Sequence, residues 1–284
     1  MLAHHLRRPP VRLVALLVFF LLVNALVAAP LSSLVDTTSP FLALVVLVLG
    51  VAAAVAAVWL YRQVIATVEE RPATELDSST ARRVLRRGTL MGAGMFTAVM
   101  LLIATFGGFD SLGWGSFWSA LATAGLMAPV AVLEEIVFRG VLFRLLEQIT
   151  GTVGALIGSA LLFGGLHLIN PNATLWGALS IAIQGGLMLG ACYAATRSLW
   201  LPIGLHFGWN FAQAGIFGAA VSGSSTSGGG IFDSVLNGST AVTGGDFGPE
   251  ASLFAPLVCT IVTVYFLRRM KRLSSAEARE LAAV

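Results

Sequence analysis

The sequence predicts an all-α membrane protein, a polytopic bundle of about eight transmembrane helices. Its 284 residues are 57% hydrophobic and only 11% charged, and the mean hydropathy is +0.87. Soluble domains carry roughly 25% charged residues, so an ordinary soluble fold is excluded. Apolar stretches long enough to cross a bilayer recur along the whole chain.

Stretches of about 17–25 apolar residues are candidates for membrane-spanning helices. We expect spans at about 11–29, 41–61, 89–107, 117–147, 152–170, 175–195, 199–221 and 251–267. The first span imitates a signal peptide, because basic residues and an apolar run precede Ala28 and Ala29. However, that run is long enough to span, and Pro30 would follow the cleavage point directly. We therefore expect it to be retained as the first helix.

The charges support this count of spans. With eight spans, the basic loops fall on one side: Arg7, Arg8, Arg12; Arg62, Arg71, Arg82, Arg83, Arg86, Arg87; Arg197; and Arg268, Arg269, Lys271, Arg272, Arg279. The alternate loops hold no Lys or Arg but contain Asp36, Asp110, Asp233, Asp246 and Glu250. The positive-inside rule then predicts that both termini are cytoplasmic. The composition, nearly free of lysine and rich in Ala and Arg, is typical of a GC-rich bacterium, so we expect the bacterial inner membrane.

The composition supports neither nucleic-acid binding nor a cysteine-based disulfide or metal site. The net charge of +3 reflects basic residues at the ends of spans, so it does not indicate nucleic-acid binding. Cys192 and Cys259 both lie in apolar segments, where they are expected to be packing residues and not disulfide partners or metal ligands. The expected partners are the lipid bilayer and a peptide or membrane-protein substrate.

Four regions follow from the spans. Residues 1–110 hold the first three spans and a cytoplasmic loop at 62–88, and residues 111–221 form the core with spans four to seven. Residues 222–250 are rich in Gly and Ser and predict a mobile external spacer. Residues 251–284 hold the last span and a cytoplasmic tail. The loop at 62–88 is either a short helix on anionic headgroups or a solvated connector.

The fourth span contains the adjacent carboxylates Glu134 and Glu135, followed by Arg139. A charge at the centre of a membrane helix costs roughly 2.5–3.5 kcal/mol even on lenient insertion scales. Glu135 and Arg139 are four residues apart and can pair on one helix face, which leaves Glu134 pointing elsewhere, free for general-base chemistry. The alternative is that all three form one ion-pair cluster between helices.

Two later spans carry further polar residues. Phe163 and His167 are four residues apart, as are His206 and Asn210, so each pair shares a helix face. If the chain turns near Gly151, Glu134 lies about 17 residues before the turn and His167 about 16 after it. At about 1.5 Å per residue, both lie at the same depth. A lone membrane histidine is also often an interhelical hydrogen bonder, so His167 by itself is equally consistent with a structural role.

Taken together, these motifs resemble the CPBP family of intramembrane proteases, also called Abi, which includes the type II CAAX prenyl endopeptidases. The motifs are Glu-Glu-x-x-x-Arg at 134–139, Phe-x-x-x-His at 163–167 and His-x-x-x-Asn at 206–210. None departs from the family pattern, and the resemblance covers about residues 115 to 215.

The resemblance implies a catalytic role for each motif. Glu134, assisted by His167, would activate a water that attacks the scissile carbonyl, and His206 and Asn210 would donate hydrogen bonds to the oxyanion. Glu135, Arg139 and Phe163 would support the structure. The family is often labelled metalloprotease, and Glu134, His167 and His206 could ligate zinc. Because the sequence has no His-Glu-x-x-His motif, we expect a glutamate-activated water without metal.

The substrate does not follow from the chain, although CAAX-type or other membrane-associated peptides fit the resemblance. The alternative to a protease is a noncatalytic immunity or scaffold protein, or a proton-coupled transporter that uses Glu134 as its carrier. A transporter predicts tolerance of Asn210→Ala, whereas an enzyme predicts that Glu134→Gln and Asn210→Ala both abolish turnover in a folded protein.

Overall fold

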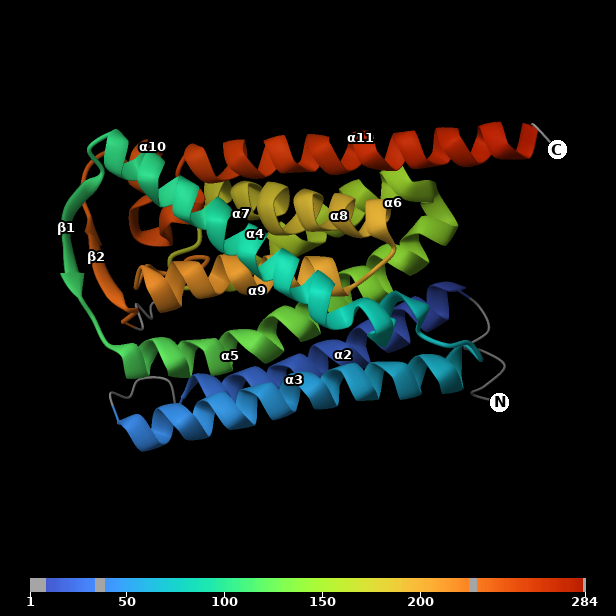
Figure 1. Ribbon diagram of the computed structural model, residues 1–284, viewed down its shortest axis with the longest axis horizontal. Coiled ribbons are helices and arrows are strands. Elements are labelled where there is room, and N and C mark those ends of the chain that lie inside the picture. Colours follow the sequence, from blue (N-terminus) through green and yellow to red (C-terminus); the bar gives the residue numbers. More distant parts are fainter. Residues whose placement is uncertain (1–8, 34–38, 225–228, 283–284) are drawn as a thin grey trace.

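The computed structural model describes residues 9–33, 39–224 and 229–282, and the side chains of 10–33, 39–224 and 229–273 (Figure 1). The predicted charges at Arg7, Arg8 and Asp36, and the side chain of Arg279, lie outside that part. The described chain is an α-helical bundle, as predicted. Its α-helices are α2 (Pro9–Ser32), α3 (Pro40–Val68), α4 (Ser78–Thr105), α5 (Phe117–Glu135), α6 (Arg144–Leu166), α7 (Leu175–Ile181), α8 (Leu189–Thr196), α9 (Trp200–Asn210), α10 (Thr240–Thr243) and α11 (Phe254–Ala282).

Three of these helices continue as π-helical segments, in which the turns are wider. The segments are η2 (Ile136–Phe143) after α5, η4 (Ala182–Met188) after α7, and η5 (Phe211–Ile216) after α9. Such segments frequently mark functional sites. Here η2 begins directly after Glu135 and η5 directly after Asn210, both singled out by the sequence.

The polytopic membrane architecture is confirmed. Among the described residues, five helical stretches are long and apolar enough to cross a membrane. One of them, 117–169, reverses at Gly151, whose φ of 73° favours glycine, so it supplies two crossings. The remaining predicted spans correspond to α9 with η5 and to α11. The turn at Gly151 lies where the sequence predicts it.

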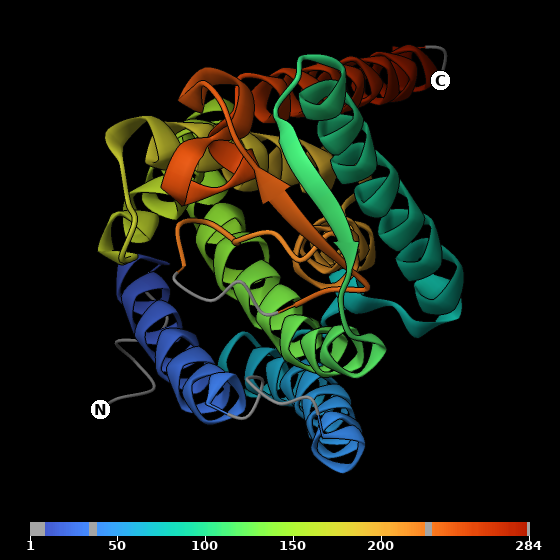
Figure 2. The same ribbon diagram turned by 90° about the vertical axis from the view of Figure 1, so that its left-hand side faces the viewer.

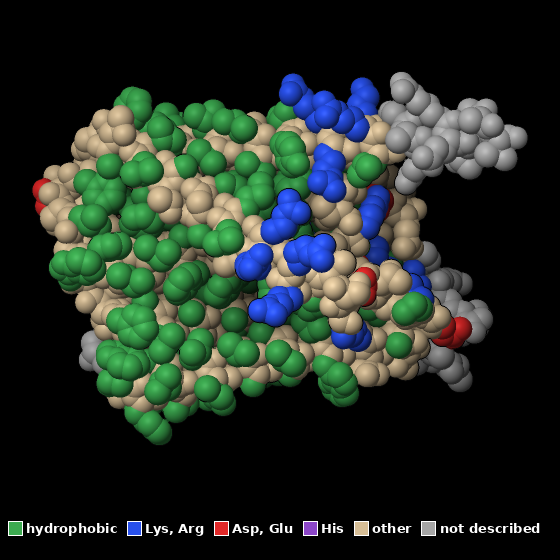
Figure 3. Space-filling model, in the orientation of Figure 1, with side chains coloured by type: hydrophobic (Ala, Val, Ile, Leu, Met, Phe, Trp, Pro, Cys, Tyr) green, Lys and Arg blue, Asp and Glu red, His purple; other side chains and the backbone are tan. Residues whose placement is uncertain are grey.

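The outer surface has two distinct zones (Figure 3). Apolar side chains cover most of the visible face, and Lys and Arg side chains gather toward one end. Exposed side chains such as Leu26, Val48 and Leu161 would be costly in water but suit contact with lipid. Together with the spans, this surface identifies a membrane protein.

Helices that carry the site approach their neighbours closely through glycine. A side chain at Gly92 of α4 would collide with the backbone of α9, and a side chain at Gly208 of α9 would collide with the backbone of α4. Small residues allow this kind of contact between membrane helices. Gly164 of α6 likewise lies against the backbone of α7, whereas a side chain at Gly165 would meet no neighbour within 4 Å.

The predicted mobile spacer at 222–250 is wrong for its described residues. Strand β2 (Phe232–Leu236) pairs with β1 (Phe109–Trp114) in an antiparallel two-stranded sheet, which crosses one end of the bundle (Figure 2). Phe232 packs on Trp114 with ring centroids 5.1 Å apart. The Gly/Ser-rich composition suggested a flexible segment. The pairing could not be predicted from it, because the partner of a strand lies far away in the sequence.

The loop at 62–88 fits neither predicted alternative. Helix α3 continues to Val68, and α4 already begins at Ser78, where Asp77 accepts a hydrogen bond from the Ser79 backbone N–H. Ion pairs hold the intervening turn: Arg71 with Glu69 (2.8 Å) and with Glu75 (2.9 Å). The segment is therefore two helix ends joined by a tight, charged turn.

These pairs predict a loss of stability in acid. Burial alone would raise the pKa of the Glu75 carboxyl, but hydrogen bonds from Arg71 and Tyr61 outweigh it and hold the pKa below its ordinary value. The folded protein therefore binds fewer protons than the unfolded chain, so this stabilisation is complete above the ordinary Glu pKa of about 4.3. It is lost as pH falls through the lower, folded pKa.

We expect the thermal unfolding midpoint in detergent to fall between about pH 5 and pH 3. Glu75→Gln should lower the midpoint at neutral pH and flatten this dependence. Equal pH dependence in the wild type and the variant would contradict the assignment.

Candidate active site

A cavity of about 540 Å³ lies among the helices. All four residues predicted to carry chemistry line it: Glu134, His167, His206 and Asn210. They come from the end of α5, from the residue that follows α6 and from the middle and end of α9. The structure thus brings the three motifs to one cavity.

The two adjacent glutamates have different surroundings. The Glu135 side chain is fully buried and accepts hydrogen bonds from Arg139 (2.8 Å) and from Nδ1 of His206 (2.9 Å). The Glu134 side chain is 22% exposed, and its carboxylate lies 3.8 Å from Nε2 of His206. The Glu135 carboxylate is therefore engaged by Arg139 and His206, while the Glu134 carboxylate faces the cavity.

Arg139 ties the fourth span to the helix beside it. Its guanidinium is fully buried, pairs with Glu135 and donates to the backbone carbonyls of Gly185 and Gly186 in η4. It also lies 5.2 Å from the ring centroid of Phe163. The ion pair predicted by the four-residue spacing is present. The hydrogen bonds from Arg139 to η4 were not predicted.

His206 sits between the two carboxylates. A carboxylate accepts hydrogen bonds, so Nδ1 of His206 carries the proton in its contact with Glu135. Glu135 thereby fixes the orientation of the imidazole, as a carboxylate does for many active-site histidines. The other nitrogen, Nε2, is left on the side of Glu134. The structure therefore sets His206 beside Glu134, a neighbour that the sequence did not predict.

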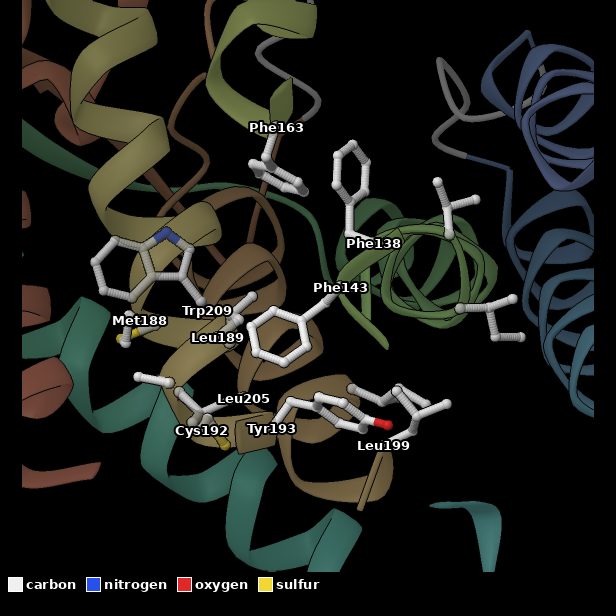
Figure 4. Close-up of a cluster of buried hydrophobic side chains, with 14 of the residues drawn as sticks. Phe138, Phe143, Phe163, Met188, Leu189, Cys192, Tyr193, Leu199, Leu205 and Trp209 are labelled. Atoms are coloured by element: carbon white, nitrogen blue, oxygen red, sulfur yellow. The ribbon is translucent and has the colours of Figure 1, made fainter. Parts of the chain in front are cut away.

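His167 is oriented by its own helix. Its Nδ1 lies 2.7 Å from the carbonyl oxygen of Phe163, and because a carbonyl can only accept, Nδ1 is the donor. In the neutral imidazole, Nε2 is then a free acceptor. Phe163 packs against His167 (5.0 Å) and Phe138 (4.6 Å between centroids). Figure 4 shows Phe138 and Phe163 turned toward each other.

Asn210 is 7% exposed, and its side chain lines the cavity. Within the described part of the chain, that carboxamide has no hydrogen-bond partner. Because the amide carries two N–H donors, it can donate to a group that enters the cavity. It lies one helical turn after His206, on the same face of α9.

The rim of the cavity has an apolar part. Leu189 and Leu205, which line the cavity, belong to the buried core and are labelled in Figure 4. The large apolar lining residues that are strongly exposed are Leu166 (44%) and Ile169 (83%), at the end of α6 and just beyond it. Exposed apolar side chains on a membrane protein suit contact with lipid, so we expect access to the cavity from that side.

Sequence reasoning missed Glu250, which it placed in the external spacer. The Glu250 carboxylate is buried and accepts hydrogen bonds from Trp209 (3.2 Å), Gln213 (3.0 Å) and the backbone N–H of Ser222 (2.6 Å). It lines the cavity and binds Ser222, in the segment after η5, beside it. The signal available in the sequence was Gln213, a second amide within a predicted span.

The arrangement does not fit a three-ligand zinc site. Among the described side chains, no group of three or more His, Cys, Asp or Glu is gathered around a point where one ion could sit. Nδ1 of His206 is engaged by Glu135, so only Nε2, which lies 3.8 Å from Glu134, could face an ion. Glu134, His167 and His206 are not gathered as a three-ligand metal centre among the described side chains.

The comparison with known families points to the same segment. The model of the Rce1-like type II CAAX prenyl endopeptidases matches residues 112–212, which confirms the resemblance carried by the three motifs. No curated protein and no solved structure matches the chain.

Proposed function

We propose that this chain, which carries the Rce1-like type II CAAX prenyl endopeptidase segment at 112–212, is an intramembrane endopeptidase in which Glu134 activates the attacking water. The family supports a CAAX-type protease in general terms. The residue roles are our proposal, and the observation that carries them is the separation of the two glutamates. Glu135 is already paired with Arg139 and hydrogen-bonded to His206. Glu134 faces a cavity that His167, His206 and Asn210 also line.

Glu134 is the general base in this proposal. A base must lie within hydrogen-bond reach of the water it deprotonates, and the Glu134 carboxylate is directed to a cavity large enough to hold water and a peptide. Two carboxylates with unlike surroundings commonly divide the work in this way. His167 assists by accepting a hydrogen bond from the same water at Nε2, while its Nδ1 is held by Phe163.

His206 and Asn210 stabilise the oxyanion. Asn210 donates from its amide, and His206 donates from Nε2 when its imidazole is protonated, because Nδ1 is already donating to Glu135. Hydrogen bonds placed where charge develops in the transition state are usually the largest catalytic contribution. Attack of water on the scissile carbonyl forms a tetrahedral intermediate. Its collapse breaks the C–N bond, and the proton taken by Glu134 passes to the leaving amine.

The substrate in this proposal is a peptide segment associated with the membrane, of CAAX type or another kind, that enters sideways from lipid. The apolar rim at Leu166 and Ile169 supports lateral entry. We propose that both termini lie in the cytoplasm and that the membrane is the inner membrane of a bacterium, because the basic residues gather at one end of the bundle and the positive-inside rule puts such loops in the cytoplasm.

The test is a peptidase assay on the full chain in detergent. A pool of farnesylated CAAX peptides and unmodified transmembrane peptides is incubated with the wild type, with and without a zinc chelator, and products are identified by mass spectrometry. We expect new cleavage products that persist with the chelator. The absence of any product from folded protein would contradict the proposal, and products lost with the chelator would show metal dependence.

Asn210→Ala separates an enzyme from a transporter. Removing one oxyanion donor is expected to lower kcat by about 10²–10³-fold, because the carboxamide would act only on the transition state. The thermal unfolding midpoint should change little, since the side chain has no partner among the described residues. An unchanged kcat would contradict the oxyanion role, whereas a folded wild type that cleaves no peptide would favour the transporter alternative.

A further inference from the structure

Helix α2 carries one polar side chain in its apolar middle. Asn24 is the only polar residue between Arg12 and Ser32. An amide inside a membrane helix is costly unless it is hydrogen-bonded, so membrane proteins usually pair such groups between helices. Asn24 lies outside the segment matched by the family model, so that match assigns it no role.

Asn24 is not paired in this way. Its Oδ1 atom is buried, and within the described residues it has no hydrogen-bond partner. Asn24 lines the same cavity as Glu134, together with Leu21 and Ala25 of α2. Residues three and four apart share a helix face, so this face of α2 forms a wall of the candidate active site.

The position of α2 matches that of a substrate-binding wall. It packs against α5 and η2, which carry Glu134 and Arg139, and against α6, which ends one residue before His167. Only 11% of its apolar window is buried, so it covers the bundle from the lipid side. A segment that enters between α2 and the end of α6, where Leu166 and Ile169 are exposed, enters a cavity that Asn24 and Glu134 both line.

A peptide bond can be attacked only where the backbone is accessible, so the bound segment must be extended at that point. An extended backbone in a water-poor cavity leaves N–H and C=O groups without partners. A carboxamide offers one acceptor and two donors, so it can pair with both groups of a single peptide unit. The free amide of Asn24 has the chemistry that such a segment requires.

We propose that Asn24 is a substrate-positioning residue, whose carboxamide hydrogen-bonds the extended backbone of the bound peptide. The inference deepens the proposed endopeptidase function and rests on it. It assigns α2 as part of the binding site, next to the segment that performs the chemistry.

The test measures binding in a background designed not to cleave. Fluorescent versions of the same farnesylated CAAX and transmembrane peptides are titrated onto Glu134→Gln and onto Glu134→Gln with Asn24→Leu, in detergent. We expect the second substitution to weaken binding about fivefold to tenfold, the value of one or two hydrogen bonds. In the otherwise wild-type protein, which retains Glu134, Asn24→Leu should raise KM by the same factor and leave kcat within about twofold.

The control is Leu26→Ala, on the same helix but 75% exposed, which should leave binding unchanged. Asn24→Leu should leave the thermal unfolding midpoint unchanged or raise it, because it removes an unpaired amide from an apolar helix. An unchanged Kd, a lowered midpoint, equal weakening by Leu26→Ala or no binding of any peptide would overturn the inference. Peptides bound in an Asn24-dependent way but not cleaved by the wild type would overturn the protease proposal alone.

Discussion

Glu134→Gln is expected to lower kcat by about 10²–10⁴-fold, the contribution of a general base. The substitution keeps the shape of the side chain and removes its ability to take a proton. Because Glu134 makes no short ion pair and is partly exposed in the cavity, we expect the thermal unfolding midpoint to stay close to that of the wild type. Peptide cleavage followed by mass spectrometry measures the first quantity, and unfolding in detergent measures the second.

The matched control for this variant is Glu147→Gln. Glu147 pairs with Arg197 and does not line the cavity, so the same chemical change there should leave kcat unaltered. A loss of activity of similar size in both variants would show a general effect of charge, and Glu134 would lose its assigned role.

Arg139→Met is expected to destabilise the protein by about 3–5 kcal/mol. Removing one partner of a buried ion pair leaves the other charge uncompensated. Here that charge is Glu135, which would keep only His206, and the carbonyls of Gly185 and Gly186 would lose their donor. The measurement is thermal unfolding in detergent, together with the yield of folded protein.

The double variant Glu135→Gln with Arg139→Met distinguishes the cause. If the single variant suffers mainly from an unpaired carboxylate, neutralising Glu135 should recover part of the lost stability. No recovery would mean that the lost contacts with η4 dominate. A single variant as stable as the wild type would contradict the account of this pair. In either variant His206 loses part of its support, so activity should fall even where folding is restored.

The sequence was most informative about contacts within one helix. The pairing of Glu135 with Arg139 follows from their four-residue spacing, and the turn at Gly151 follows from a glycine between two apolar runs. The placement of Glu134 and His167 beside one cavity agrees with counting residues on either side of that turn. These features depend on local geometry, which one sequence contains.

Contacts between distant segments could not be predicted in this way. The bond from His206 to Glu135 joins residues 71 positions apart, and no local pattern in the sequence predicts it. Glu250 was missed for the same reason, because its donors come from α9, η5 and Ser222. The pairing of β1 with β2 also depends on how the bundle brings two loops together.

The most direct test of the central claim compares wild type and Glu134→Gln on the same membrane peptide in ¹⁸O-labelled water. If Glu134 activates the attacking water, the wild type will release a fragment whose new carboxylate carries one ¹⁸O atom, and the folded variant will release none above background. Labelled fragment formed equally by both proteins would contradict the claim, because another group would then activate the water.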